Sequence, residues 1–153
     1  MTEQLKNLLP YLQEQFEKGQ IVRIKPGGNS MLPMLHPNRD VVELSALPGE
    51  LRKYDLPLYR RADGSFVLHR IVEAGDTYTC LGDNQYRTEF GIQREQMVAL
   101  VTAFVRNGRR YTVQDPRYRM YCRIWPALRS VKHVIKQPKY YLRRVLLWMI
   151  SKP

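Results

Sequence analysis

The chain has 153 residues, of which 44% are hydrophobic and 25% charged, so its composition allows one compact domain and excludes a disordered chain. No stretch approaches the ~20 apolar residues of a membrane-spanning helix, and we expect a cytoplasmic protein, soluble or peripheral on the inner face of a membrane. Cys80 and Cys122 lie too far apart for a metal-binding or redox motif, so we expect two buried, reduced thiols and neither a metal nor a cofactor.

Residues 2–18 are predicted to form an amphipathic helix that Gly19 ends, and Pro10 allows a later start near Asn7. The apolar residues of this helix recur at helical spacing: Leu5, Leu8, Leu9, Leu12 and Phe16. From Ile21 onward, short apolar runs separated by turn residues predict strands. The strand candidates span residues 21–24, 40–44, 56–60, 66–73, 77–81, 97–105 and 110–113.

Turn residues indicate how these strands connect. Pro57 favours an edge position for its strand, because proline has no N–H to donate to a neighbour. Gly75-Asp76 and Asn107-Gly108 predict two hairpins. The sequence therefore predicts a mostly β fold, with an antiparallel-sheet domain over residues 20–115 and an N-terminal helix in residues 1–19.

The net charge of +11 is concentrated at the C-terminal end. Residues 1–104 carry 12 Lys/Arg against 13 Asp/Glu, whereas residues 105–153 carry 13 Lys/Arg against Asp115 alone. We therefore treat residues 116–153 as a separate basic, aromatic-rich helical tail. Its basic and aromatic residues in 117–150 suit an anionic membrane surface; nucleic acid is a less favoured partner, and packing on the β domain or binding an acidic protein stays open.

A serine and a histidine form the first candidate pair for chemistry. Ser30 follows Gly28 and Asn29 in a turn, where glycine lets the backbone bend sharply and a substrate chain come close. An alcohol needs a base to take its proton, and His69 is the histidine that lies in a predicted strand, where a sheet could fix its ring. Loop serines and strand histidines are each common without function, so the residues alone predict a pair to be tested.

Four boxes in the same order resemble those of type I signal peptidases and LexA-like serine peptidases. They are Ser30-Met31-x-Pro33, Lys53-Tyr54-Asp55-x-x-Leu58-Tyr59-Arg60, His69-Arg70-Ile71-Val72 and Leu81-Gly82-Asp83-Asn84. The last two resemble boxes of the Ser-His branch, the endoplasmic-reticulum type. The resemblance covers about residues 20–105 and implies a signal-peptidase/LexA-like β fold with Ser30 as nucleophile and His69 as general base. Two features depart from the family. The membrane anchor expected of a signal peptidase is not found before Ser30. Tyr54 stands where the family has glycine, and we expect this difference to alter a turn and not the chemistry.

Two carboxylates compete to orient His69. Pairing across the predicted hairpin sets Gly82 opposite His69, so Asp83 reaches the ring only where the strand ends or bulges, which the glycine favours. Asp83 is the preferred candidate; Glu89 is the reserve, because it matches a second acidic position of the resembling branch. Gly-Asp-Asn is also an ordinary turn sequence.

The nucleophile turn is also expected to bind the oxyanion and the substrate. The Ser30 N–H is the expected oxyanion donor, with the Asn29 side chain as a further candidate. Some bacterial relatives place a hydroxyl two residues before the nucleophile, where this chain has Gly28. We expect the substrate to lie beside Gly28, Asn29, Met31 and Pro33.

Taken together, the residues and the resemblance predict a serine endopeptidase. It would cleave an extended peptide or precursor protein by a Ser-His(-Asp) mechanism. The alternative is a catalytically silent module of the same fold that binds a peptide or a membrane. LexA-like autoproteolysis is less favoured, because the single N-terminal helix offers no DNA-reading motif.

Overall fold

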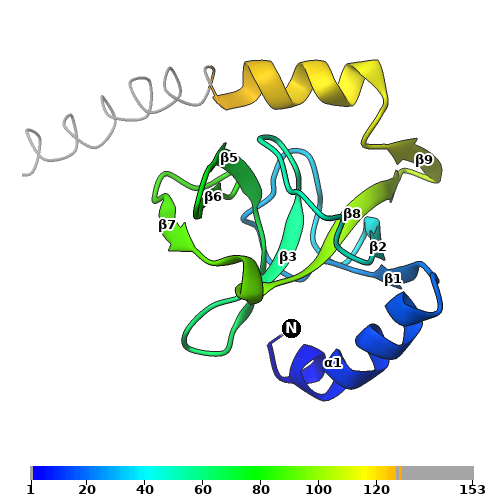
Figure 1. The fold of residues 1–153 in the computed structure, drawn as a ribbon. Helices are drawn as coiled ribbons and strands as arrows, with labels where there is room; N and C mark the ends of the chain where they lie inside the picture. The colour runs from blue at the N-terminus through cyan, green and yellow to red at the C-terminus, as the bar shows by residue number, and fades with distance from the viewer. Residues whose placement is uncertain (1, 127, 129–153) are drawn as a thin grey trace, which may run out of the picture. The chain divides into compact units, whose positions relative to one another are not determined.

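The computed structural model describes residues 2–126 and residue 128, with side chains from residue 9 onward (Figure 1). The chain divides into two compact units, Met1–Arg119 and Met120–Pro153. Within the described residues, no helix is long and apolar enough to cross a membrane. Cys80 and Cys122 are both buried thiols, as expected.

The first unit contains one α-helix followed by short strands (Figure 1). The elements are α1 (Thr2–Glu17), β1 (Val22–Ile24), β2 (Val41–Ser45), β3 (Pro57–Arg60), β4 (Phe66–Leu68), β5 (Arg70–Ala74), β6 (Tyr78–Leu81), β7 (Glu89–Ile92), the 3-10 helix η1 (Arg94–Gln96), β8 (Met97–Arg106) and β9 (Arg109–Thr112). Residues 116–126 are helical. This confirms the predicted mostly antiparallel β fold with a helix at each end.

The strands form two antiparallel sheets. The larger has the order β1-β2-β8-β3-β4, with β9 also paired to β8, and the smaller has the order β5-β6-β7. The long strand β8 is central, because it pairs with β2, β3 and β9. Its alternate residues from Met97 to Ala103 are buried, as expected when successive side chains point to opposite faces of a sheet. Asn107 and Gly108, with φ of 50° and 74°, form the tight turn to β9 that their sequence predicts.

The helix begins at Thr2, so the later start near Asn7 was wrong, and it continues through Pro10. Gly19 ends it in the left-handed conformation, with φ of 69°, and its N–H donates to the Phe16 carbonyl (2.9 Å). The end of the helix therefore follows its glycine, as predicted.

Two strand predictions need correction. Pro57 does not mark an edge, because β3 pairs with both β8 and β4; the proline is the first residue of the strand, where a missing N–H is tolerated. The predicted single strand 66–73 is two strands, β4 and β5, which belong to different sheets. The chain changes sheets at His69, so this residue stands at a corner and not within a strand.

The Tyr54 turn keeps the backbone that a glycine would adopt. Tyr54 has φ of 80°, in the left-handed region, and its N–H donates to the Ile71 carbonyl (2.8 Å). The Ile71 N–H in turn donates to the Asp55 carbonyl (2.9 Å). Tyr54 therefore forms a turn that is joined to the strand following His69.

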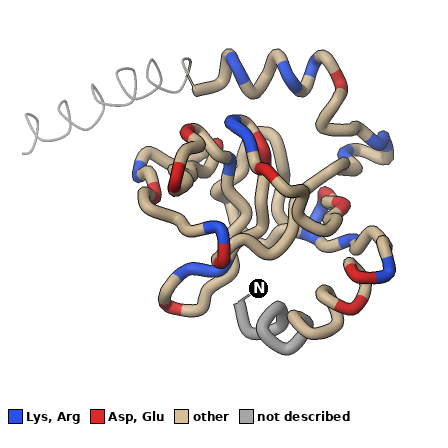
Figure 2. The backbone as a smooth tube through the Cα atoms, viewed as in Figure 1, with Lys and Arg blue, Asp and Glu red and all other residues tan. Residues whose placement is uncertain are grey.

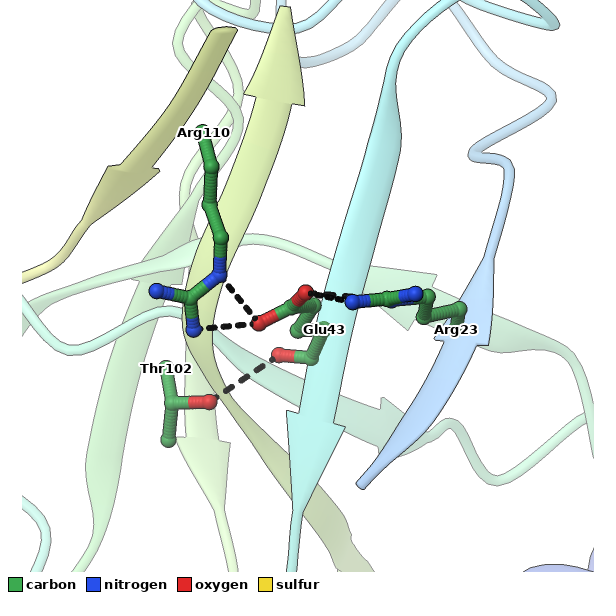
Figure 3. A network of polar contacts seen from close by, with 4 residues as sticks. All are labelled: Arg23, Glu43, Thr102 and Arg110. Carbon is green, nitrogen blue, oxygen red and sulfur yellow. Dashed lines mark hydrogen bonds and ion pairs between the residues drawn. The ribbon is translucent and has the colours of Figure 1, made fainter.

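A buried carboxylate connects three strands of the larger sheet (Figure 3). Glu43 of β2 is 1% exposed and accepts hydrogen bonds from Arg23 of β1 (2.8 and 3.0 Å) and Arg110 of β9 (2.6 and 3.0 Å). Both guanidinium groups are more than half exposed, so solvent screens them and each pair contributes modestly. The buried carboxylate still needs both donors, because it has lost its own hydration.

We predict that Glu43→Gln lowers the free energy of unfolding by about 1 kcal/mol at neutral pH. The hydrogen bond from Arg110 lowers the pKa of Glu43 below its usual 4.5; burial opposes this, and Arg23 adds to it. A lowered folded-state pKa stabilises the protein above the unfolded-state pKa, and this contribution is lost as the pH falls through the folded-state value. Urea unfolding of both proteins should therefore give a difference that shrinks in acid. This role would be contradicted if the stability difference were the same at neutral and at acidic pH. It would also be contradicted if the exposed control Glu95→Gln lowered the free energy of unfolding as much as Glu43→Gln does.

Candidate active site

Ser30 lies in a turn that is anchored by its apolar neighbours. Within the turn of residues 28–35, the Leu35 N–H donates to the Met31 carbonyl (2.9 Å). Met31, Met34 and Leu35 are all at most 4% exposed, whereas Ser30 is only partly buried. The core therefore holds the turn while leaving the serine at the surface of a pocket.

The residues after β6 hold this turn from the other side. The Asn84 N–H donates to the Ser30 carbonyl (2.7 Å), and the Asn84 side-chain amide donates to the Asn29 carbonyl (3.2 Å). The Gln85 N–H donates to the Gly82 carbonyl (2.9 Å), which closes the turn that presents Asn84. The Gly-Asp-Asn sequence is thus a turn, and this turn positions Ser30.

Gly82 lies between Ser30 and His69. The pairing of Arg70 with Leu81 makes His69 and Gly82 the next opposed residues, as the sequence predicted. A β-carbon on Gly82 would lie 2.8 Å from the Ser30 carbonyl oxygen and 3.0 Å from His69 Nε2. Both atoms therefore pack against the same face of Gly82, at a distance that only a residue without a side chain permits.

The other ring nitrogen of His69 faces a carboxylate. Nδ1 lies 3.1 Å from Glu89 Oε1 and 3.1 Å from the Tyr59 hydroxyl. An ionised carboxylate only accepts hydrogen bonds, so it favours the tautomer in which Nδ1 carries the hydrogen and Nε2 keeps its lone pair. This is the tautomer that a general base for a serine requires.

Burial and charge set the protonation of this group. His69 is 1% exposed, and burial lowers its pKa to about 4, although the nearby Glu89 carboxylate acts in the opposite direction. Burial would raise the pKa of Glu89, but hydrogen bonds from Arg61 and Tyr59 lower it overall. Arg61 Nε lies 2.8 Å from Glu89 Oε2, and its NH2 group also contacts the carboxylate. At neutral pH the site therefore holds a neutral imidazole beside an ionised carboxylate.

The structure gives the position beside Nδ1 to Glu89, the reserve candidate, and not to the preferred Asp83. Asp83 forms a two-point ion pair with Arg70 (2.9 and 2.7 Å), and both side chains are at most 4% exposed. Arg70 also donates to the Tyr118 hydroxyl (2.9 Å). The Asp83 charge still raises the pKa of His69, so it acts on the ring at longer range.

One pocket is lined by Ser30, His69 and the predicted substrate-binding residues before and after the serine, but not by Asp83 or Glu89. It has a volume of about 440 Å³, and Ser30, His69, Gly28, Asn29 and Met31 line it together with strand β4. The lining does not include the exposed Pro33. A second pocket of about 1100 Å³ adjoins it and shares three lining residues: Arg61, Asn84 and Gln85.

The Ser30 N–H is available as an oxyanion donor, because it forms no hydrogen bond within the described part of the chain. The described residues also contain no hydrogen bond between the Ser30 hydroxyl and His69. Catalytic hydrogen bonds are often long before substrate binds, and they tighten in the complex. No group of three or more His, Cys, Asp or Glu among the described residues could hold a metal ion.

Sequence reasoning missed Tyr59 and Arg61 as members of the site. Tyr59 and Arg61 are two residues apart, and alternate residues of an extended chain point to the same face, so the sequence does indicate that they share a face. The sequence does not show that this face meets His69, since the contact depends on how the two sheets pack.

We predict different effects for the two carboxylates. Asp83→Asn should lower the free energy of unfolding by about 3 kcal/mol, because it leaves the buried Arg70 charge without a counter-charge. Glu89→Gln should affect stability less, but it should slow the reaction of Ser30 with a serine-directed phosphonate at least about tenfold, because the amide lacks the negative charge that orients Nδ1 and stabilises the imidazolium. Urea unfolding and labelling rates measure the two effects. A stable but unreactive Asp83→Asn would assign the orienting role to Asp83 instead.

We also predict that Gly82→Ala disrupts the pair. The new β-carbon would overlap a backbone oxygen of the Ser30 turn, which cannot move without shifting the turn. Overpacking of this kind costs about 1–3 kcal/mol, and labelling of Ser30 should be lost. Gly49→Ala is the matched control, because its β-carbon would meet nothing within 4 Å. Unchanged labelling in Gly82→Ala would show that the close approach is not needed.

Comparison with known proteins assigns no family to this site. No family model, curated protein or solved structure matches the chain.

Proposed function

We propose that the chain is a serine endopeptidase of the signal-peptidase/LexA-like type, with Ser30 as nucleophile and His69 as general base. One observation carries this proposal: the Ser30 backbone carbonyl and His69 Nε2 pack on the same face of Gly82, both residues line one pocket, and Glu89 lies 3.1 Å from Nδ1. A base with its lone pair toward the serine turn is what activates an alcohol.

The proposed reaction proceeds through an acyl-enzyme. Ser30 Oγ attacks the peptide carbonyl carbon and gives its proton to His69 Nε2, while the Ser30 N–H donates to the oxyanion. The imidazolium, stabilised by Glu89, then protonates the leaving amine as the C–N bond breaks. Water, deprotonated by His69, hydrolyses the ester and restores the serine.

The environment of His69 suits this cycle. The lowered pKa keeps the ring neutral at pH 7, so it is ready to accept a proton. Charge appears on the ring only in the transition state, and the Glu89 carboxylate already lies at Nδ1 to stabilise it. The low ground-state pKa is therefore compatible with a base whose charged form is favoured only during the reaction.

The sheet edge beside the pocket supports an extended peptide as substrate. Within the described residues β4 is the last strand of the larger sheet, and Phe66, Val67 and Leu68 of this strand line the pocket next to His69. These residues are at most 8% exposed, so a peptide would reach the outer edge of β4 through the pocket, where it could pair with the strand by backbone hydrogen bonds. A peptide bound in this way would bring a backbone carbonyl to the Ser30 turn.

The resemblance to signal peptidases adds support, because its boxes converge in space. The serine box and the Gly-Asp-Asn box are joined by Asn84, and the histidine packs on Gly82. Tyr54 adopts the glycine-like conformation at the position where the family has glycine.

A catalytically silent peptide-binding module is the second candidate. The observation that favours it is that no hydrogen bond joins the Ser30 hydroxyl to His69 among the described residues. Such a module would use the same pocket and strand edge without a proton transfer.

We predict that a phosphonate probe labels the wild type on Ser30. Ser30→Ala should abolish labelling, and His69→Ala should slow it at least about 100-fold, because the proton acceptor is lost. Ser45→Ala and His36→Ala are matched controls that should label normally. Mass spectrometry locates the adduct, and a peptide-library digest provides a second readout that does not depend on the probe. Labelling that survives in Ser30→Ala would overturn the assignment of Ser30 as nucleophile. A folded wild type that neither reacts with the probe nor cleaves the peptide library would favour the peptide-binding module instead.

A further inference from the structure

The second unit carries an exposed apolar face on its described helical part. Met120, Ile124 and Leu128 are 57%, 47% and 48% exposed. Their spacing of four residues places them one above another on the same side of a helix. We call these three residues the apolar face.

Aromatic residues lie beside the apolar face. Tyr121 and Trp125 each follow a member of the face by one position, and their rings stack at 5.5 Å with an interplanar angle of 18°. Both are only partly buried. Tyrosine and tryptophan at the border of an apolar surface are typical of segments that bind at the level of lipid headgroups.

The charge around this face has one sign. Residues 116–153 contain ten Lys/Arg and no Asp/Glu. Figure 2 shows basic bands along the described helix that begins at residue 116 and an acidic band at its start. The sequence places Asp115 directly before this helix and Arg117, Arg119 and Arg123 within it. Lys and Arg extend their charged ends to headgroup phosphates while their stems lie along apolar surface. The sequence also continues the apolar spacing with Val131, Val134 and Ile135, which lie outside the described residues.

We propose that the apolar face inserts into the headgroup region of an anionic lipid bilayer. A bilayer uses both features of the segment, because apolar side chains enter the acyl boundary while basic side chains meet anionic headgroups. A nucleic acid would use the charge alone and leave Met120, Ile124 and Leu128 in water. This docking does not depend on catalysis, and it would hold whether or not Ser30 is a nucleophile.

Vesicle co-sedimentation of the full-length protein tests the proposal. Vesicles of phosphatidylcholine with phosphatidylserine should bind the wild type, and vesicles of phosphatidylcholine alone should bind it far more weakly. Ile124→Glu should weaken binding to the anionic vesicles at least about tenfold, because it places a charge in the apolar face. Ile21→Glu is the matched control: Ile21 is 53% exposed in the first unit, and the substitution changes the net charge equally. Its affinity should stay within about twofold of the wild type.

Three outcomes would overturn the proposal. Wild type that stays in the supernatant with anionic vesicles would exclude lipid docking. Equal losses in Ile124→Glu and Ile21→Glu would show that net charge, and not the apolar face, causes binding. Tight binding to an RNA oligonucleotide that Ile124→Glu leaves unchanged, without vesicle binding, would assign the segment to nucleic acid. Circular dichroism of each variant establishes that it is folded before these comparisons are made.

Discussion

The close packing of Gly82 between the Ser30 turn and His69 is the contact on which the site depends. It brings together two segments that are distant in the sequence, and it exists because position 82 has no side chain. The same turn supplies the Asn84 N–H that binds the Ser30 carbonyl, so one short segment sets both the position of the serine and its distance from the ring. A β-carbon at this position would separate the proposed nucleophile from its base.

The Arg70–Asp83 ion pair lies directly beside this contact. Arg70 follows His69 and pairs with Leu81, whereas Asp83 follows Gly82, so in this antiparallel arrangement the two charged residues lie diagonally across the His69–Gly82 position. Burying two charges is costly, and an ion pair of this kind is weak support for stability in itself. Its value here is positional, because a one-residue slip between the two strands would separate the charges inside the protein. We infer that this penalty keeps Gly82 opposite His69, which explains a structural role for an aspartate that the sequence placed in the catalytic group.

Local sequence patterns predicted most of the strands, but they did not predict which residues surround the His69 ring. Alternation and turn residues located β8, β9 and the β5–β6 hairpin, because these signals act within a few residues. The change of sheet at His69 left no such signal, since residues 66–71 form an apolar run that one strand would also show. Glu89 was the reserve candidate on the resemblance alone, and β7, the strand that carries it, was not predicted. Phe90 and Gly91 of that strand are exposed, and the pairing of Glu89 with Cys80 is a tertiary contact. Ser30 and His69 were candidates from their residue types together with the resemblance, whereas the residues around the His69 ring depend on packing.

The surroundings of His69 favour the proposed catalytic role over a binding pocket. Tyr59 and Arg61 come from the segment of β3 in the larger sheet, and Glu89 comes from β7 in the smaller sheet, so the group exists only when both sheets are packed. A pocket that merely binds a peptide gains nothing from a carboxylate held behind the far nitrogen of a buried imidazole. That carboxylate carries a desolvation cost, which Arg61 offsets. Its position is useful when the ring becomes charged, as it does in proton transfer from a serine. The arrangement behind the ring therefore argues for catalysis more strongly than the serine itself does.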